Sequence, residues 1–124
     1  MARILVVDDE SEIRLLLRQA LERRGHIVDE AADGKGALQH FAEQQPDLVI
    51  TDLVMPEQEG IETIQALRRK CSGIPIIAIS GGGRVGPQDY LAMAAQLGAD
   101  RTFSKPFRLE DIANAVRELT AKST

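Results

Sequence analysis

The feature that most constrains this chain is a regular alternation of short apolar runs with longer amphipathic stretches. Runs such as Ile-Leu-Val-Val at residues 4–7 are apolar on both faces and rich in β-branched residues, which is typical of strands buried on both sides of a sheet. The stretches between the runs place apolar residues three and four positions apart, which is the spacing of a helix with one buried face. The alternation therefore predicts an α/β fold, with a parallel sheet and helices on both of its faces.

Turn and capping residues give approximate bounds to these elements. The first helix is expected to begin at Ser11 and to end before Gly25. Its apolar face is expected to consist of Ile13, Leu16, Leu17, Ala20 and Leu21. The predicted strands cover residues 4–7, 27–31, 48–51, 74–79 and 101–104, and the later helices cover residues 34–43, 60–71, 88–97 and 109–119. Five such units are too few for a closed eight-stranded barrel, so we expect a (βα)5 doubly wound open sheet.

Composition narrows the class of protein further. The 124 residues of the chain (1–124) fit a single domain, and the single cysteine, Cys71, excludes an internal disulfide. The net charge is −4, the longest basic run is residues 68–70, and only 3% of the residues are aromatic, so nucleic-acid binding is not expected. No segment approaches the ~18 apolar residues of a membrane span, and no signal peptide is evident. We therefore expect a soluble, cytoplasmic domain without membrane insertion.

Reactive side chains follow four of the five predicted strands. They are Asp8, Asp9 and Glu10 after the first strand, Asp52 after the third, Ser80 after the fourth and Lys105 after the fifth. In an open doubly wound sheet, ligands bind at the carboxyl ends of the strands, where these residues are expected to meet. Several carboxylates at one place repel one another, and a single lysine does not neutralise them, so a hard divalent cation such as Mg²⁺ is expected. A carboxylate can attack phosphorus, so the set suits phosphoryl transfer, with Ser80 and Lys105 holding phosphoryl oxygens.

Each of these residues also has a structural explanation when it is considered alone. Asp8 and Asp9 could simply favour the N-terminus of a helix, and Asp52 could be a turn residue. Ser80 precedes three glycines and could belong to a turn, and lysines usually lie on the surface. The phosphoryl-transfer interpretation therefore depends on all four positions meeting at one edge of one sheet.

Taken together, the motifs resemble the receiver domain of bacterial two-component response regulators, the CheY-like superfamily, over essentially the whole chain. They are the apolar run ending in Asp8-Asp9, residues 47–56 (Asp-Leu-Val-Ile-Thr-Asp-Leu-Val-Met-Pro) with Gly60 after them, residues 76–80 (Ile-Ile-Ala-Ile-Ser), residues 98–100 (Gly-Ala-Asp) and residues 105–107 (Lys-Pro-Phe). The resemblance implies a flavodoxin-like parallel sheet of five strands in the order 2-1-3-4-5.

The resemblance also implies a role for each site residue. Asp52 would accept a phosphoryl group from the phosphohistidine of a histidine kinase or a histidine phosphotransfer protein. Asp8 and Asp9 would hold Mg²⁺ together with Asp52 and the backbone carbonyl of Val54. The chain would signal through contact with a downstream protein target, as a regulator or phosphorelay intermediate. It would be a phosphoacceptor domain and not an enzyme, promoting only its own phosphorylation and dephosphorylation.

Further implied features concern the fifth strand and its surroundings. Ser80 and Lys105 would bind the phosphoryl group, and the peptide bond between Lys105 and Pro106 would be cis. Thr102 stands where the family commonly has an aromatic switch residue, and its neighbour Phe103 should face the other side of the sheet. How switching proceeds without that aromatic residue is left open.

Two positions that tune the lifetime of the aspartyl phosphate in the family are Val54 and Gly82 here. Neither side chain can orient an attacking water by a hydrogen bond, so dephosphorylation is expected to lack side-chain help. The segment 81–87 is a few residues longer than is typical and is glycine-rich, so it is expected to be mobile.

Several alternatives remain open. A Mg²⁺-dependent phosphohydrolase would use the same aspartyl nucleophile, although Val54 stands where such enzymes usually have a second acid. A flavodoxin-like binding module would need a phosphate-binding loop where Asp8 and Asp9 would repel the ligand. A receiver-like fold that never turns over phosphate is disfavoured by the complete set of acids, hydroxyl and lysine. The chain is also compatible with the N-terminal receiver of a longer regulator.

Overall fold

The computed structural model describes residues 1–52, 59–71, 73–80 and 98–121. The strands of this part of the chain are β1 (Arg3–Val7), β2 (Ile27–Ala31), β3 (Leu48–Asp52), β4 (Ile76–Ser80) and β5 (Arg101–Ser104). The helices are α1 (Ser11–Glu22), α2 (Gly34–Glu43), α3 (Glu59–Lys70) and α5 (Leu109–Thr120). The predicted helix at residues 88–97 lies outside the described residues.

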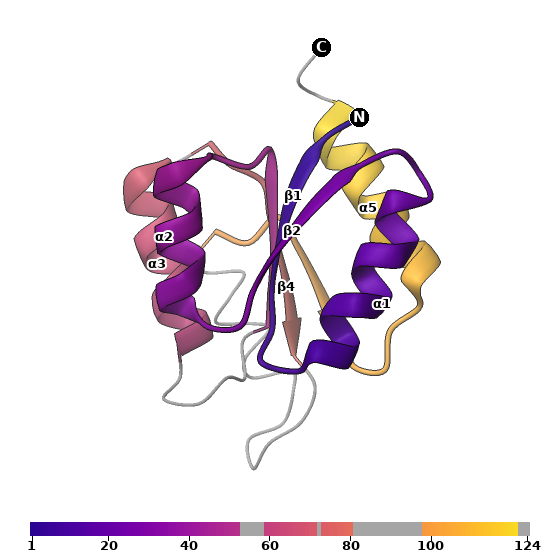
Figure 1. Cartoon of the computed structure of the whole chain (residues 1–124), viewed down its shortest axis with the longest axis horizontal. Helices are drawn as coiled ribbons and strands as arrows, with labels where there is room; N and C mark the ends of the chain where they lie inside the picture. Colours follow the sequence, from indigo (N-terminus) through magenta and orange to yellow (C-terminus); the bar gives the residue numbers. More distant parts are fainter. Residues whose placement is uncertain (53–58, 72, 81–97, 122–124) are drawn as a thin grey trace.

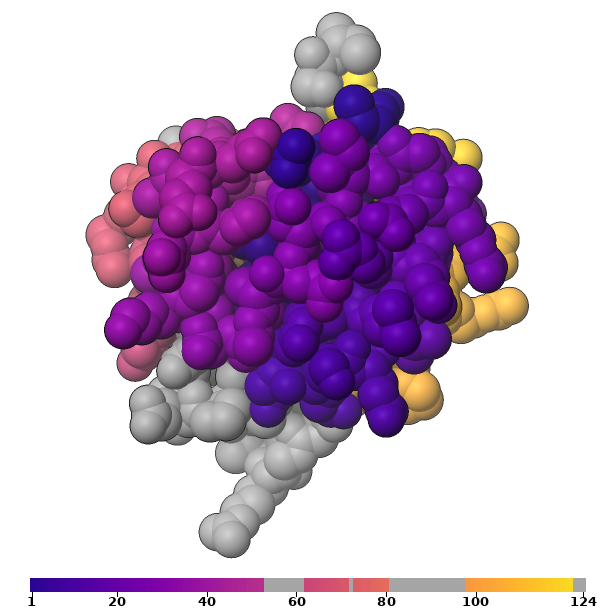
Figure 2. All heavy atoms as spheres, viewed as in Figure 1, coloured from indigo at the N-terminus to yellow at the C-terminus, as the bar shows by residue number. Residues whose placement is uncertain are grey.

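All five strands pair in parallel, in the order β2-β1-β3-β4-β5. This confirms the predicted strand order and the flavodoxin-like fold. Helices α1 and α5 cover one face of the sheet and helices α2 and α3 cover the other (Figure 1). Because β2 is an edge strand, the outer surface on that side is formed largely by the N-terminal third of the chain (Figure 2).

The apolar runs are apolar on both faces because each strand contributes to two cores. In β1, Ile4 and Val6 belong to the cluster under α1 and α5, whereas Leu5 and Val7 belong to the cluster under α2 and α3. Every residue of β3 and β4 is buried. Each fully buried aliphatic side chain contributes about 1.5–3 kcal/mol, so the central strands hold the fold in one register.

Two details of the sequence prediction are wrong. Leu16 is 47% exposed, although it was expected on the buried face of α1. Leu16 lies about 100° around the helix axis from the buried Leu17. The buried face of α1 is therefore narrower than the spacing of its apolar residues suggests. Strand β4 begins at Ile76 and not at residue 74, because the N–H of Val49 bonds to the carbonyl of Pro75, which has no N–H of its own to continue the ladder.

The common direction of the strands determines where their loops meet. Val7 pairs with Thr51, Asp52 with Ile79, and Ser80 with Ser104, so the strands end at nearly the same level. Their carboxyl ends emerge at the edge of the sheet far from the labelled N-terminus (Figure 1). Among the described residues, no helix has the length and apolar character needed to cross a membrane.

Candidate functional site

Four carboxylates come together at the carboxyl edge of the sheet. Asp8, Asp9 and Glu10 follow β1, and Asp52 is the last residue of β3. Each offers an oxygen within 4.8 Å of the oxygens of the others. Asp8 and Asp52 are buried, whereas Asp9 and Glu10 are exposed. The structure therefore brings together the four acidic residues that follow or end β1 and β3, as expected from the sequence.

The ammonium group of Lys105 lies among these carboxylates. Its Nζ is 3.1 Å from Oδ2 of Asp52, 3.4 Å from Oδ2 of Asp8 and 3.3 Å from Oε1 of Glu10. One positive charge thus faces several negative charges, as the sequence suggested. Among the described residues, the site therefore carries more negative than positive charge.

Burial and the neighbouring charges shift the pKa values of Asp8 and Lys105. Burial, with the nearby charge of Asp52 adding to it, raises the pKa of Asp8 from 3.8 to about 6 against the opposing effects of the Glu10 N–H and of Lys105. Burial acts to lower the pKa of Lys105, but the charges of Asp52 and Asp8 and the bonds to Asp52 and Glu10 outweigh it and raise the pKa from 10.5 to about 12. The lysine therefore stays charged, while the carboxyl group of Asp8 resists ionisation.

Hydrogen bonds with residues that the sequence did not indicate hold the loop after β1 in place. The N–H of Asp8 donates to the carbonyl of Ala31 (3.1 Å), and its own carbonyl accepts from Nη1 of Arg14 (2.6 Å). Arg14 also donates from Nε to Glu30 on β2 (3.0 Å). The reach of Arg14 depends on its rotamer and leaves no signal in the sequence.

Ser80 and Pro106 border the lysine. The backbone N–H of Lys105 donates to the carbonyl of Ser80 (2.8 Å), and the peptide bond between Lys105 and Pro106 is cis, as the resemblance implied. Ser80 is fully buried, and its Oγ has no hydrogen-bond partner within the described part of the chain. A buried hydroxyl without a partner costs free energy, so this group is suited to a ligand that supplies one.

The remaining expected positions fall into two groups. Thr102 is exposed, whereas Phe103 packs against the core under α1 and α5, so the two face opposite sides of the sheet as expected. Val54 and Gly82 lie outside the described residues.

The acidic cluster fits a magnesium ion in its donor chemistry. It offers carboxylate oxygens from Asp8, Asp9, Glu10 and Asp52, and because Mg²⁺ prefers oxygen ligands and takes one or two carboxylates, the three aspartates suffice without Glu10. Burial and, to a lesser extent, the charge of Asp52 raise the pKa of Asp8, and a divalent cation would favour its charged form.

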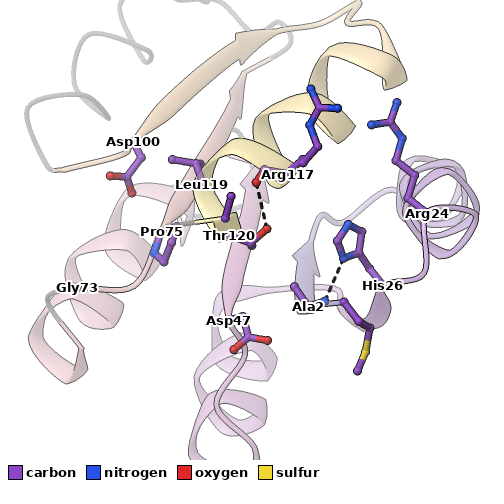
Figure 3. Close-up of a pocket in the computed structure, with 12 residues that line it drawn as sticks. Ala2, Arg24, His26, Asp47, Gly73, Pro75, Asp100, Arg117, Leu119 and Thr120 are labelled. Atoms are coloured by element: carbon purple, nitrogen blue, oxygen red, sulfur yellow. Dashed lines mark hydrogen bonds between the residues drawn. The ribbon is translucent and has the colours of Figure 1, made fainter. Parts of the chain in front are cut away.

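A hollow of about 1040 Å³ lies at the opposite, amino-terminal edge of the sheet and is not lined by the acidic cluster (Figure 3). Three titratable side chains there bond to backbone N–H groups: Asp47 to Arg3 (2.8 Å), His26 to Ala2 (3.1 Å) and Asp100 to Ile76 (2.8 Å). These side chains serve the fold, so the candidate site is the acidic edge and not this hollow.

Fold and site together define a class: a doubly wound domain with an acidic, lysine-containing centre at the carboxyl ends of its parallel strands. Residues 4–117 match the response regulator receiver domain family, to which the chain belongs. It is therefore a receiver domain of the kind found in two-component response regulators.

Named relatives support this assignment. The chain is 35% identical over 122 residues to the response regulator MprA of Mycolicibacterium vanbaalenii, covering 98% of this chain and 52% of that protein. It is 34% identical to the chemotaxis protein CheY of Halobacterium salinarum, covering 94% and 95%. A receiver domain protein of Clostridium thermocellum has the same fold, with a TM-score of 0.90, 29% identity and coverage of 99% and 97%. The chain thus spans about half the length of the MprA relatives and nearly all of CheY.

Proposed function

We propose that this receiver domain is a phosphorylation-dependent switch whose phosphoacceptor is Asp52. The observation that carries the proposal is the position of Asp52: a buried carboxylate at the end of β3, 3.1 Å from the Lys105 ammonium and beside the acidic cluster. A nucleophilic carboxylate next to a cation and a metal-binding cluster has what phosphoryl transfer requires, which is mainly positioning and charge neutralisation.

The proposed reaction is a transfer from phosphohistidine. A carboxylate oxygen of Asp52 attacks phosphorus and forms an O–P bond, while the N–P bond of the donor breaks and its electron pair remains on the imidazole nitrogen. The donor is the phosphohistidine of a histidine kinase or a histidine phosphotransfer protein. The product is an acyl phosphate on Asp52, and the domain then signals through a downstream protein target.

The other site residues have distinct proposed roles. Asp8, Asp9 and Asp52, with the carbonyl of Val54, would hold Mg²⁺, which supplies positive charge beside the phosphoryl oxygens. Lys105, fixed next to the cis bond to Pro106, would bind one phosphoryl oxygen.

Ser80 would donate its hydroxyl to another phosphoryl oxygen and thereby gain the partner that it lacks within the described residues. Val54 and Gly82 would leave hydrolysis without side-chain assistance, and Thr102 would replace the aromatic switch residue. These roles rest on the family resemblance and on the geometry of the described residues.

The test is phosphorylation by acetyl phosphate in the presence of Mg²⁺. The intact mass should increase by one phosphoryl group, and hydroxylamine, which cleaves acyl phosphates, should reverse the increase. The Asp52→Asn variant should show no increase. Asp111→Asn, which makes the same change at an exposed position on α5, should behave as wild type. A wild-type protein that gains no phosphoryl group, or an Asp52→Asn variant that gains one, would refute the proposal.

A further inference from the structure

The three carboxylates that contact Lys105 are not equivalent. Asp8 and Asp52 are buried and belong to the proposed metal and phosphoacceptor set, whereas the side chain of Glu10 is 61% exposed and has neither role. Its Oε1 nevertheless lies 3.3 Å from Nζ of Lys105, closer than the 3.4 Å contact that Asp8 makes. The structure thus contains an ion pair that the proposed function leaves unused.

The backbone of Glu10 explains why its side chain reaches the lysine. Glu10 occupies the N-cap position of α1 in an extended conformation, and its side chain makes no capping hydrogen bond to that helix. Its N–H donates to Oδ1 of Asp8 (2.8 Å), which ties its backbone to the acidic cluster. An acidic side chain at this position ordinarily serves the helix N-terminus, but here it is directed to Lys105.

The donors of Lys105 are fully occupied in this arrangement. An ammonium group has three N–H donors, and the structure provides three carboxylate acceptors for them, on Asp8, Glu10 and Asp52. A phosphoryl oxygen that binds Lys105 must therefore displace one of these contacts. Because Glu10 is the exposed partner, its carboxylate is the one that water can solvate after it is released.

We propose that Glu10 is a positioning residue that retains Lys105 among the carboxylates before phosphorylation and so slows the loading of Asp52. The inference rests on the proposed function, because it assumes that Lys105 receives the phosphoryl group. Glu10 acts through the lysine and touches neither the metal nor the phosphorus.

The test compares Glu10→Gln with Glu12→Gln at saturating Mg²⁺. Glu12 is an exposed residue in the first turn of the same helix, so its substitution removes the same charge without removing the lysine contact. Exposed ion pairs contribute modestly, so the rate of phosphorylation by acetyl phosphate should increase about two- to fivefold in Glu10→Gln. The rate should not change in Glu12→Gln, and the gain should shrink as salt screens the pair.

A double-mutant cycle distinguishes an effect of Glu10 through its contact with Lys105 from direct repulsion between Glu10 and the anionic acetyl phosphate. In a Lys105→Met background, the additional Glu10→Gln change should leave the rate unaltered. If Glu10→Gln increases the phosphorylation rate just as much without the lysine, Glu10 acts only by electrostatic repulsion of the donor and the inference is wrong.

A second measurement does not depend on phosphorylation at all. In the unphosphorylated protein, the NMR signals of the Lys105 side chain should shift in Glu10→Gln and not in Glu12→Gln. Unchanged Lys105 signals in Glu10→Gln would overturn the inference, even if Lys105→Met reacts too slowly to measure. A wild-type protein that cannot be phosphorylated would refute the proposed function instead, so the two failures are distinguishable.

Discussion

The two edges of the sheet carry similar residues but treat their charges in opposite ways. At the amino edge, the carboxylates of Asp47 and Asp100 each accept a hydrogen bond from a backbone N–H at the start of a strand. At the carboxyl edge, Asp8 and Asp52 are buried beside one another and both contact Lys105. The first arrangement satisfies each charge locally, whereas the second leaves like charges in contact.

The difference shows where the fold gives up stability for function. Buried carboxylates that repel one another make the folded state less stable than it would be with neutral side chains. The pKa of Asp8, raised to about 6 mainly by burial and further by the charge of Asp52, reflects the cost of an ionised carboxylate at this position. A bound cation or a transferred anion changes the charge balance of this edge, so the same feature that weakens the fold makes the edge responsive.

The sharpest test of this comparison is to remove the buried charge of Asp8. At neutral pH, Asp8→Asn should raise the free energy of unfolding of the metal-free protein. The increase of the pKa from 3.8 to about 6 corresponds to at most about 3 kcal/mol. Chemical denaturation without Mg²⁺ measures the effect, and the stabilisation that Mg²⁺ gives the wild-type protein should be lost in the variant.

Asp9→Asn is the matched control for this prediction. Asp9 is exposed, so its substitution should change the stability of the metal-free protein by no more than about 0.5 kcal/mol. A destabilised Asp8→Asn protein would show that the carboxyl edge is not under electrostatic strain, and the contrast between the two edges would disappear.

The opposite result is expected at the amino edge. Oδ2 of Asp100 accepts from the N–H of Ile76 (2.8 Å) and from Nη2 of Arg68 (3.1 Å). Arg68 also donates to the carbonyls of Ile74 and Gly98, so these groups form one network at the start of β4. Asp100→Ala removes the acceptor of a partly buried N–H and should destabilise the protein by about 2 kcal/mol.

Asp100→Asn tests whether the hydrogen bond or the charge matters more. The asparagine keeps an oxygen acceptor for the N–H of Ile76, so Asp100→Asn should lower the free energy of unfolding by less than half as much as Asp100→Ala does. Both variants should still be phosphorylated by acetyl phosphate, because Asp100 precedes β5 at the amino edge, whereas the proposed site lies at the carboxyl ends of the strands. A stability unchanged in Asp100→Ala would mean that this network contributes little to the fold.

The same contrast explains how much the sequence could predict. Asp8, Asp52, Ser80 and Lys105 follow or end strands, and the common direction of parallel strands brings such positions to one edge whatever the side chains do. The cis bond before Pro106 came from the resemblance and not from any pattern in the chain. The general place of the site was therefore predictable from topology and family likeness together.

Features that depend on the path of a single side chain were not predictable. The ion pair of Glu10 and the reach of Arg14 to the Asp8 carbonyl are set by rotamers, which apolar periodicity does not encode. Leu16 shows the same limit, because spacing indicates which helix face is apolar but not how wide a stripe the sheet covers.

The smallest expected effect concerns a carboxylate whose pKa moves in the other direction. Burial acts to raise the pKa of Asp29, but hydrogen bonds from His40 and Arg3 outweigh it and lower the pKa below 3.8. A lowered pKa stabilises the fold above the unfolded-state value, and that stability is lost as the pH falls through the folded-state pKa. Asp29→Asn should therefore cost less than about 1 kcal/mol near pH 5, and the difference from wild type should disappear in stronger acid.

Asp8→Asn and Asp29→Asn should change the free energy of unfolding over different pH ranges. For Asp8, the raised pKa means that wild-type stability falls as the pH rises from about 4 to about 6, so the gain from Asp8→Asn grows over that range. Urea titrations of both variants across pH 2 to 8 measure the two windows separately. If the Asp29→Asn difference instead grew on acidification, its pairing with Arg3 and His40 would not stabilise the charged form. Asp8 and Asp29 would then not have pKa values shifted in opposite directions, as their surroundings predict.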